Sequence, residues 1–210
     1  MNTPKIIVIT GPPSSGKTTQ CSLVLDELKY LHRLDFDKLL KSKQNEYPII
    51  KELRDRGKLK SGIPADVVKS IFDEYVSNKT EEDAILFYRG PSTVDEAVLL
   101  PTPQLFIVLS IDTNTAIQRA STRRVDEVSG VTYNLIHDEQ KIKELGIAHR
   151  LKKRFGDDSD LLKARIERHK ARMELIVEYY SNKTVVETIN GNAPQKDITE
   201  KIIELVNKIM

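Results

Sequence analysis

The chain has 210 residues, of which 39% are hydrophobic and 30% are charged. This composition allows a buried core and excludes a disordered chain. The 33 Lys and Arg residues balance 31 Asp and Glu residues, so we expect no nucleic-acid partner. The single cysteine, Cys21, excludes an internal disulfide and a multi-cysteine zinc site. No apolar run is long enough to span a membrane, and the N-terminal residues lack a signal-peptide pattern. We therefore expect a cytoplasmic protein.

The N-terminal segment predicts a strand, a turn and a helix. Residues 5–10 (KIIVIT) are apolar and β-branched, which is typical of a strand buried on both faces. A turn rich in Gly, Pro and Ser follows, and residues 18–31 predict a helix. A weaker strand pattern lies near residues 32–36.

Helical and strand patterns then alternate to the end of the chain. They predict helices over 37–56 and 64–77, strands over 84–88 and 104–110, a helix over 115–124 capped by Asp112, a long helix over 159–180, a strand over 184–189 and a helix over 197–210. Such alternation indicates an α/β fold with a parallel sheet covered on both faces. Residues 125–153 are polar with mixed charges, and we expect a mobile insertion there.

The turn after the first strand carries a phosphate-binding motif. Residues 11–18 (GPPSSGKT) match the pattern G-x-x-x-x-G-K-[ST] between a strand and a helix. Two glycines allow successive N–H groups to converge on a phosphate, and the helix N-terminus adds partial positive charge. Lys17 is expected on the β- and γ-phosphates, and the Thr18 hydroxyl on Mg²⁺. The predicted ATP-binding residues are Gly11, Pro12, Pro13, Ser14, Ser15, Gly16, Lys17, Thr18 and Thr19.

The motif and the segments after it resemble adenylate kinases and the wider nucleoside monophosphate kinase family. The similar segments are GKTTQ, RDRGKLKSGIPADVV, GPSTVDEA, RASTRRVDEVSGVTY and RFGDDSDLLKARIERH. They keep the order in which the family has them and cover nearly the whole chain.

The resemblance implies a three-layer P-loop NTPase fold with five parallel strands. It implies a core (residues 1–33, 66–124 and 154–210), a monophosphate-binding helical insertion (residues 34–65) and a LID (residues 125–153). In some relatives cysteine-type ligands hold zinc in the LID. No Cys lies in that segment here, and we expect no metal there, with His137 and His149 exposed.

The resemblance also assigns four arginines to phosphate handling. Arg123, Arg154 and Arg165 match family positions that contact the transferring phosphates, and Arg119 matches one that also lies near the ATP adenine. Arginine suits this work because its planar fork bonds two phosphate oxygens. Arg119 and Arg123 are four residues apart, so we expect them on one helix face. Taken singly, each is as consistent with a solvated surface charge.

The acceptor side departs from the family pattern. Tyr88 stands where the family has an Asp that supports Mg²⁺, and Ser92 stands where it has an Arg that grips the monophosphate. Glu96 replaces a Gln that reads the adenine, and ionised Glu only accepts hydrogen bonds. Arg89 and Lys41 are candidate replacements on the monophosphate. Asp35 or Asp37 could support Mg²⁺.

Two functions remain in competition. In the favoured one, the chain is a monomeric kinase that transfers the γ-phosphoryl group of ATP, with Mg²⁺, to AMP or a related nucleoside monophosphate. In the other, it is a weak or inactive relative that binds nucleotide or serves as a structural subunit, for example in the axoneme of a cilium or flagellum. A different P-loop kinase of small molecules is disfavoured, because the similarity extends well past the loop.

Overall fold

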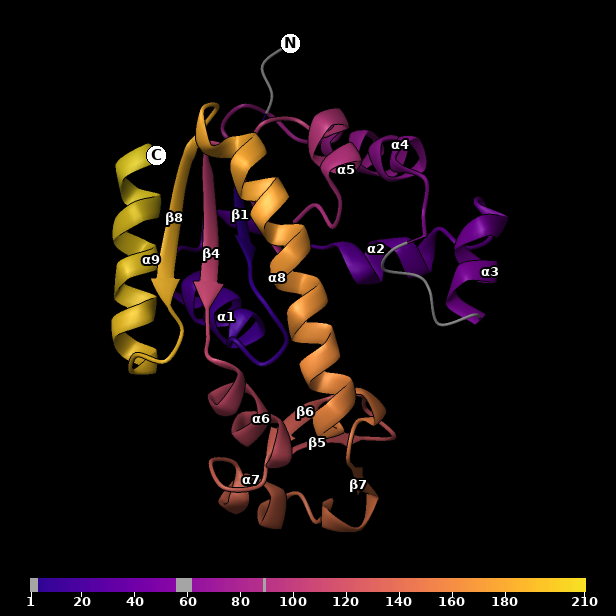
Figure 1. Ribbon diagram of the computed structural model, residues 1–210, viewed down its shortest axis with the longest axis vertical. Helices are drawn as coiled ribbons and strands as arrows, with labels where there is room; N and C mark the ends of the chain where they lie inside the picture. The colour runs from indigo at the N-terminus through magenta and orange to yellow at the C-terminus, as the bar shows by residue number, and fades with distance from the viewer. Residues whose placement is uncertain (1–3, 56–61, 89) are drawn as a thin grey trace.

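The centre of the protein is a parallel sheet of five strands in the order β2-β3-β1-β4-β8 (Figure 1). This computed structural model describes residues 4–55, 62–88 and 90–210. The strands are β1 (Lys5–Thr10), β2 (Leu31–Asp35), β3 (Ala84–Tyr88), β4 (Leu105–Ser110) and β8 (Val185–Asn190). The predicted parallel sheet is confirmed, with the strands at 5–10 and 84–88 at the predicted bounds.

Helices cover both faces of the sheet, which gives three layers. On one face lie α1 (Lys17–Glu27) and α9 (Gln195–Ile209), packed on inward side chains such as Ile7 and Ile107. On the other lie α4 (Ala65–Val76), α5 (Val94–Leu99) and α8 (Ser159–Ser181), packed on Val8 and Phe106. Every residue of β3 is buried, because a central strand meets a helical layer on each side.

Two helices project from the sheet beside β2. They are α2 (Phe36–Ser42) and α3 (Pro48–Asp55), and Figure 1 shows them below α4, on the side of the molecule away from α9. They share a small apolar core with α4, through Leu40, Ile50 and Ile71. They belong to the expected monophosphate-binding insertion, of which residues 56–61 lie outside the described part of the chain.

A second, antiparallel sheet lies at one end of the molecule, in the order β6-β5-β7 (Figure 1). This region contains α6 (Thr113–Ser121), β5 (Arg123–Asp126), β6 (Thr132–Asn134), α7 (Glu139–Glu144), η1 (Ala148–Arg150), β7 (Leu151–Lys152) and η2 (Phe155–Asp157). The segment 125–153, expected as a loose insertion, thus has its own sheet and an apolar core of Tyr133, Ile142 and Ile147. Its expected mobility stays a prediction.

A buried carboxylate ties the strands of this second sheet together. Asp126 is fully buried and accepts hydrogen bonds from the Ser129 hydroxyl at 2.6 Å and from Arg150 Nη2 at 2.9 Å. These bonds lower the pKa of Asp126, the Ser129 hydroxyl being the largest cause. Hydrogen bonds to a charged carboxylate therefore help to hold this segment together.

Candidate active site

The phosphate loop joins the end of β1 to the start of α1, as the motif requires. Gly11 has a φ of 150°, and a Cβ there would lie 2.5 Å from the carbonyl oxygen of Leu109. Gly16 has a φ of 94°, in the left-handed region, and is the N-cap residue directly before α1. Both conformations favour glycine, so the motif's two glycines are explained by the backbone that they allow.

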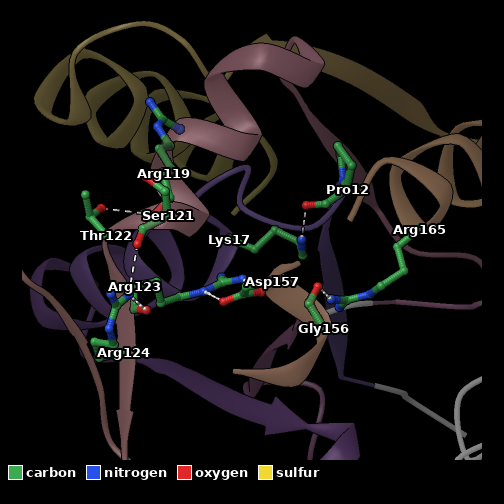
Figure 2. A network of polar contacts seen from close by, with 10 residues as sticks. All are labelled: Pro12, Lys17, Arg119, Ser121, Thr122, Arg123, Arg124, Gly156, Asp157 and Arg165. Carbon is green, nitrogen blue, oxygen red and sulfur yellow. Dashed lines mark hydrogen bonds and ion pairs between the residues drawn. The ribbon is translucent and has the colours of Figure 1, made fainter. Parts of the chain in front are cut away.

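Side chains of the loop converge on its interior. Lys17 Nζ donates a hydrogen bond to the carbonyl oxygen of Pro12 at 2.6 Å and lies 3.4 Å from the Ser15 hydroxyl (Figure 2). The Ser14 hydroxyl is buried and has no hydrogen-bond partner among the described atoms. A buried polar group without a partner is costly, and a bound phosphate would satisfy it. Thr19, the last predicted residue of the loop, is exposed on α1.

Arginines from separate segments gather around residues 156–157. Arg123 donates through Nε to Oδ2 of Asp157 at 2.7 Å and through Nη2 to Oδ1, and the Asp157 side chain is buried (Figure 2). Arg165 Nη1 donates to the carbonyl oxygen of Gly156 at 2.6 Å. Burial, and then the nearby charge of Arg154, lower the pKa of Arg165. Several cations thus crowd one carboxylate, which favours a further anion.

The prediction that Arg119 and Arg123 share a helix face is wrong. Helix α6 ends at Ser121, and Arg123 is the first residue of β5, where it pairs with Asn134. Figure 2 shows Arg119 on α6, directed away from Arg123. The helix ends early because residues 123–126 pair with strands that are distant in sequence, and helical spacing cannot reveal such pairing.

Sequence reasoning missed one residue of α8, His169. Burial is the main cause that lowers the pKa of His169 to about 3, and the charges of Lys17 and Arg172 lower it further. His169 therefore lies within electrostatic reach of the phosphate loop. It follows Arg165 by four positions on one helix, and that spacing could have identified it.

The carboxyl end of β3 meets the loop through a pair of hydroxyl groups. The buried Tyr88 hydroxyl lies 2.5 Å from the Thr18 hydroxyl, and the Arg33 guanidinium lies 5.2 Å from the centre of the Tyr88 ring. Burial raises the pKa of Tyr88. Asp35, opposite Tyr88 on β2, caps α2 by accepting from Lys38 N at 3.3 Å and lies 3.4 Å from Arg33 Nη2.

The predicted acceptor residues are not all brought together. Glu96 is buried at the start of α5, where its Oε2 accepts from the backbone N–H of Ser92 at 2.6 Å. Burial raises the pKa of Glu96, although the Ser92 bond opposes the shift. Lys41 is exposed in the last turn of α2. Arg89 and the side chain of Asp37 lie outside the described residues.

Known proteins resemble this chain along its full length. It is 28% identical to the chloroplastic adenylate kinase of Zea mays, over 99% of this chain and 94% of that protein. It is 27% identical to an adenylate kinase of Staphylococcus epidermidis, over 97% and 99% of the two chains, and 25% identical to one of Acholeplasma laidlawii, over 96% and 98%. No protein-family model matches the chain.

The chain is similar to proteins named adenylate kinase. Full-length similarity, the five-stranded order of the sheet and the loop between β1 and α1 agree on this. The resemblance seen in the sequence depends on several similar segments in the same order, which is more specific than the phosphate-loop motif alone. Within the described residues, no helix has the length and apolar character needed to cross a bilayer.

The residues beside the phosphate loop do not fit Mg²⁺ in the usual way. A P-loop holds the ion with its Ser or Thr hydroxyl and an acidic residue of a neighbouring strand. Here the Thr18 hydroxyl contacts Tyr88, and Asp35 is engaged with Lys38 and Arg33. In the described part of the chain, no group of three or more His, Cys, Asp and Glu could hold a metal. His137 and His149 are exposed, as predicted.

Proposed function

We propose that this chain binds ATP on its phosphate loop and transfers the γ-phosphoryl group to a nucleoside monophosphate, with AMP as the first candidate. The observation that carries the proposal is the group of three arginines, Arg123, Arg154 and Arg165, around Asp157. These cations come from both sides of the LID segment (residues 125–153), and they suit a ligand with several negative charges. Full-length similarity to proteins named adenylate kinase supports the same reaction.

The proposed mechanism is charge neutralisation with precise placement. A phosphoryl group in transfer needs little covalent help from the protein, and its charge must be stabilised. In this proposal Lys17 leaves the Pro12 carbonyl and binds the β- and γ-phosphates, while the loop N–H groups hold the phosphate chain. Arg123, already oriented by Asp157, binds the transferring group together with Arg154 and Arg165. Arg119 lies near the ATP adenine.

Two parts of the chain are proposed to close on the substrates. The insertion (residues 34–65), with Lys41, would receive the monophosphate, and Glu96 would contact its base. The LID segment would cover the triphosphate and exclude water, which prevents hydrolysis of ATP. We further propose that the protein acts as a cytoplasmic monomer, and size-exclusion chromatography tests the monomer.

The test is an acceptor panel with purified protein. ATP and Mg²⁺ are combined with AMP, CMP, UMP or GMP, and the products are separated by chromatography. We expect ADP from AMP, and at least about a hundredfold loss in the Lys17→Ala variant, because that variant removes a charge from the transferring phosphate. Product formation equal in both proteins would contradict the proposal, since it would come from a contaminating kinase.

The residues at the carboxyl end of β3 favour a second function. Tyr88 and Ser92 remove one carboxylate and one arginine from the family pattern, and Tyr88 contacts Thr18 directly. The chain would then bind nucleotide with weak or no transfer and act as a structural subunit, for example in an axoneme. ATP that raises the melting temperature without any transfer in the acceptor panel would select this function.

A further inference from the structure

We infer that Tyr88 closes the metal position beside the phosphate loop, so that the protein binds metal-free ATP at least as tightly as Mg-ATP. The inference rests on the proposed function only in requiring that ATP binds to the loop. It concerns the form of the nucleotide that the site accepts, and not whether transfer follows.

The first step is the position of Tyr88 in the sheet. Tyr88 is the last residue of β3, and its register partners are Ile9 of β1 and Asp35 of β2. Because the strands are parallel, Tyr88 and the loop after β1 lie at the same edge of the sheet. The side chain is buried, with 3% of its surface exposed, and its hydroxyl lies 2.5 Å from the Thr18 hydroxyl.

The second step is the chemistry of that contact. Mg²⁺ requires near-octahedral oxygen ligands at about 2.0–2.1 Å and keeps several waters, which need room around the ion. The Tyr88 hydroxyl lies 2.5 Å from the Thr18 hydroxyl, the one loop hydroxyl that would ligate the ion, and it takes a hydrogen-bonding position on that group. A neutral phenol supplies none of the negative charge that a strand-end carboxylate brings.

The third step is the charge around the pair. The Arg33 guanidinium lies 5.2 Å from the Tyr88 ring centre, so a cation already occupies this neighbourhood. Asp35, the carboxylate at the end of β2, lies 3.4 Å from Arg33 Nη2 and accepts from Lys38 N. A divalent cation would be repelled by the charge of Arg33. It would also compete with Arg33 and the Lys38 N–H for the Asp35 carboxylate.

The experiment measures the dissociation constant of ATP by isothermal titration calorimetry, once in EDTA and once in excess Mg²⁺. The proteins are the wild type, Tyr88→Asp, Tyr88→Asn and Tyr88→Phe, each checked for folding by circular dichroism. The Asn variant is the control for Asp, because it removes the same ring without adding charge. The Phe variant removes only the hydroxyl contact with Thr18.

For the wild type we expect ATP to bind in EDTA at least as tightly as in Mg²⁺. For Tyr88→Asp we expect Mg²⁺ to tighten ATP binding by about tenfold, because a carboxylate then faces the Thr18 hydroxyl. In Tyr88→Asn and Tyr88→Phe, Mg²⁺ should tighten ATP binding much less. If Tyr88→Asp fails to fold, the wild-type comparison and the Phe variant still decide the question.

The inference is overturned if the wild type binds Mg-ATP about tenfold more tightly than metal-free ATP, which is the dependence expected of a loop that ligates the ion. Absence of ATP binding in both buffers would overturn it together with the proposed function. Absence of transfer in the acceptor panel, with the expected binding pattern, would overturn only the transfer reaction.

Discussion

Arg123 and Asp157 form a charged contact with two hydrogen bonds in the candidate site. The carboxylate is buried and receives two hydrogen bonds from one guanidinium, while Arg154 and Arg165 lie nearby. The three arginines together carry more positive charge than Asp157 alone neutralises. Asp157 therefore positions Arg123 but does not neutralise all three arginines. A bound triphosphate would neutralise the remaining positive charge.

Replacing Asp157 by Asn should destabilise the protein by about 3 kcal/mol, since it leaves the arginines without their buried partner. Saturating ATP should recover more stability in this variant than in the wild type, because phosphate oxygens replace the lost charge. Thermal and urea denaturation with and without ATP measure both effects. Asp160→Asn, an exposed change one turn away, is the matched control. Equal ATP stabilisation of the wild type and Asp157→Asn would contradict an anion site here.

Glu96 combines a structural and a proposed binding role. Its Oε2 accepts from the Ser92 N–H, so Glu96→Ala should cost about 2 kcal/mol by leaving that donor unpaired. Glu96→Gln should cost less than about 1 kcal/mol, because the amide oxygen still accepts. The amide also donates, so Glu96→Gln should raise the ratio of AMP to GMP turnover. An unchanged ratio in the acceptor panel would limit Glu96 to its structural role.

Single residues were the part of the site that the sequence predicted best. The loop motif located Gly11, Gly16 and Lys17, since their spacing reflects local backbone geometry. The contact between Tyr88 and Thr18 joins residues 70 positions apart, and no local pattern encodes it. The substitution of Tyr for Asp was visible in the sequence, while its partner became visible only in the folded chain.

At the scale of elements, helix α8 connects the LID segment to the sheet. Its 23 residues carry Arg165 toward Gly156 and His169 toward Lys17, while Met173 and Ile176 pack on the core. A long helix suits this task because residues four positions apart share a face. The sequence predicted this helix correctly, since a long helix shows its 3.6-residue periodicity in the sequence. The sequence-based prediction placed the end of α6 too late, because the pairing of β5 with β6 ends the helix at Ser121.

His169 should make stability depend on pH. Its pKa in the fold is about 3, below the ordinary value of 6.5. Between these two pH values, His169 is therefore protonated in the unfolded chain and neutral in the folded protein. Stability is therefore lost as the pH falls below 6.5, by about 1 kcal/mol between pH 7.5 and pH 5.5. Urea denaturation at the two pH values measures this loss, and His169→Gln should lack it. His137→Gln, at an exposed histidine, should keep the full loss. The same pH dependence in wild type and His169→Gln would show that His169 is protonated in the fold.

At the scale of the whole molecule, one rigid sheet carries two projecting parts. The insertion of α2 and α3 follows β2 and lies at one side of the molecule, and the segment of residues 125–153 continues from α6 at its lower end in Figure 1. The order of strands and helices followed from the sequence, because each strand is a short apolar run between helical patterns. The second sheet could not be predicted from the sequence, because its strands are short and polar. The pairing of its strands and the hydrogen bonds of Asp126 hold it together.

The measurement that tests the account most directly is a single turnover with ATP labelled on its γ-phosphate. Enzyme in excess over labelled ATP is mixed with AMP, and transfer of the label to ADP is followed over time. The account predicts transfer by the wild type, and a rate at least about a hundredfold lower in Lys17→Ala and Arg123→Ala, since each variant removes a charge from the transferring group. Label that stays on ATP bound to the wild type, or transfer that is unchanged in both variants, would contradict phosphoryl transfer at this loop.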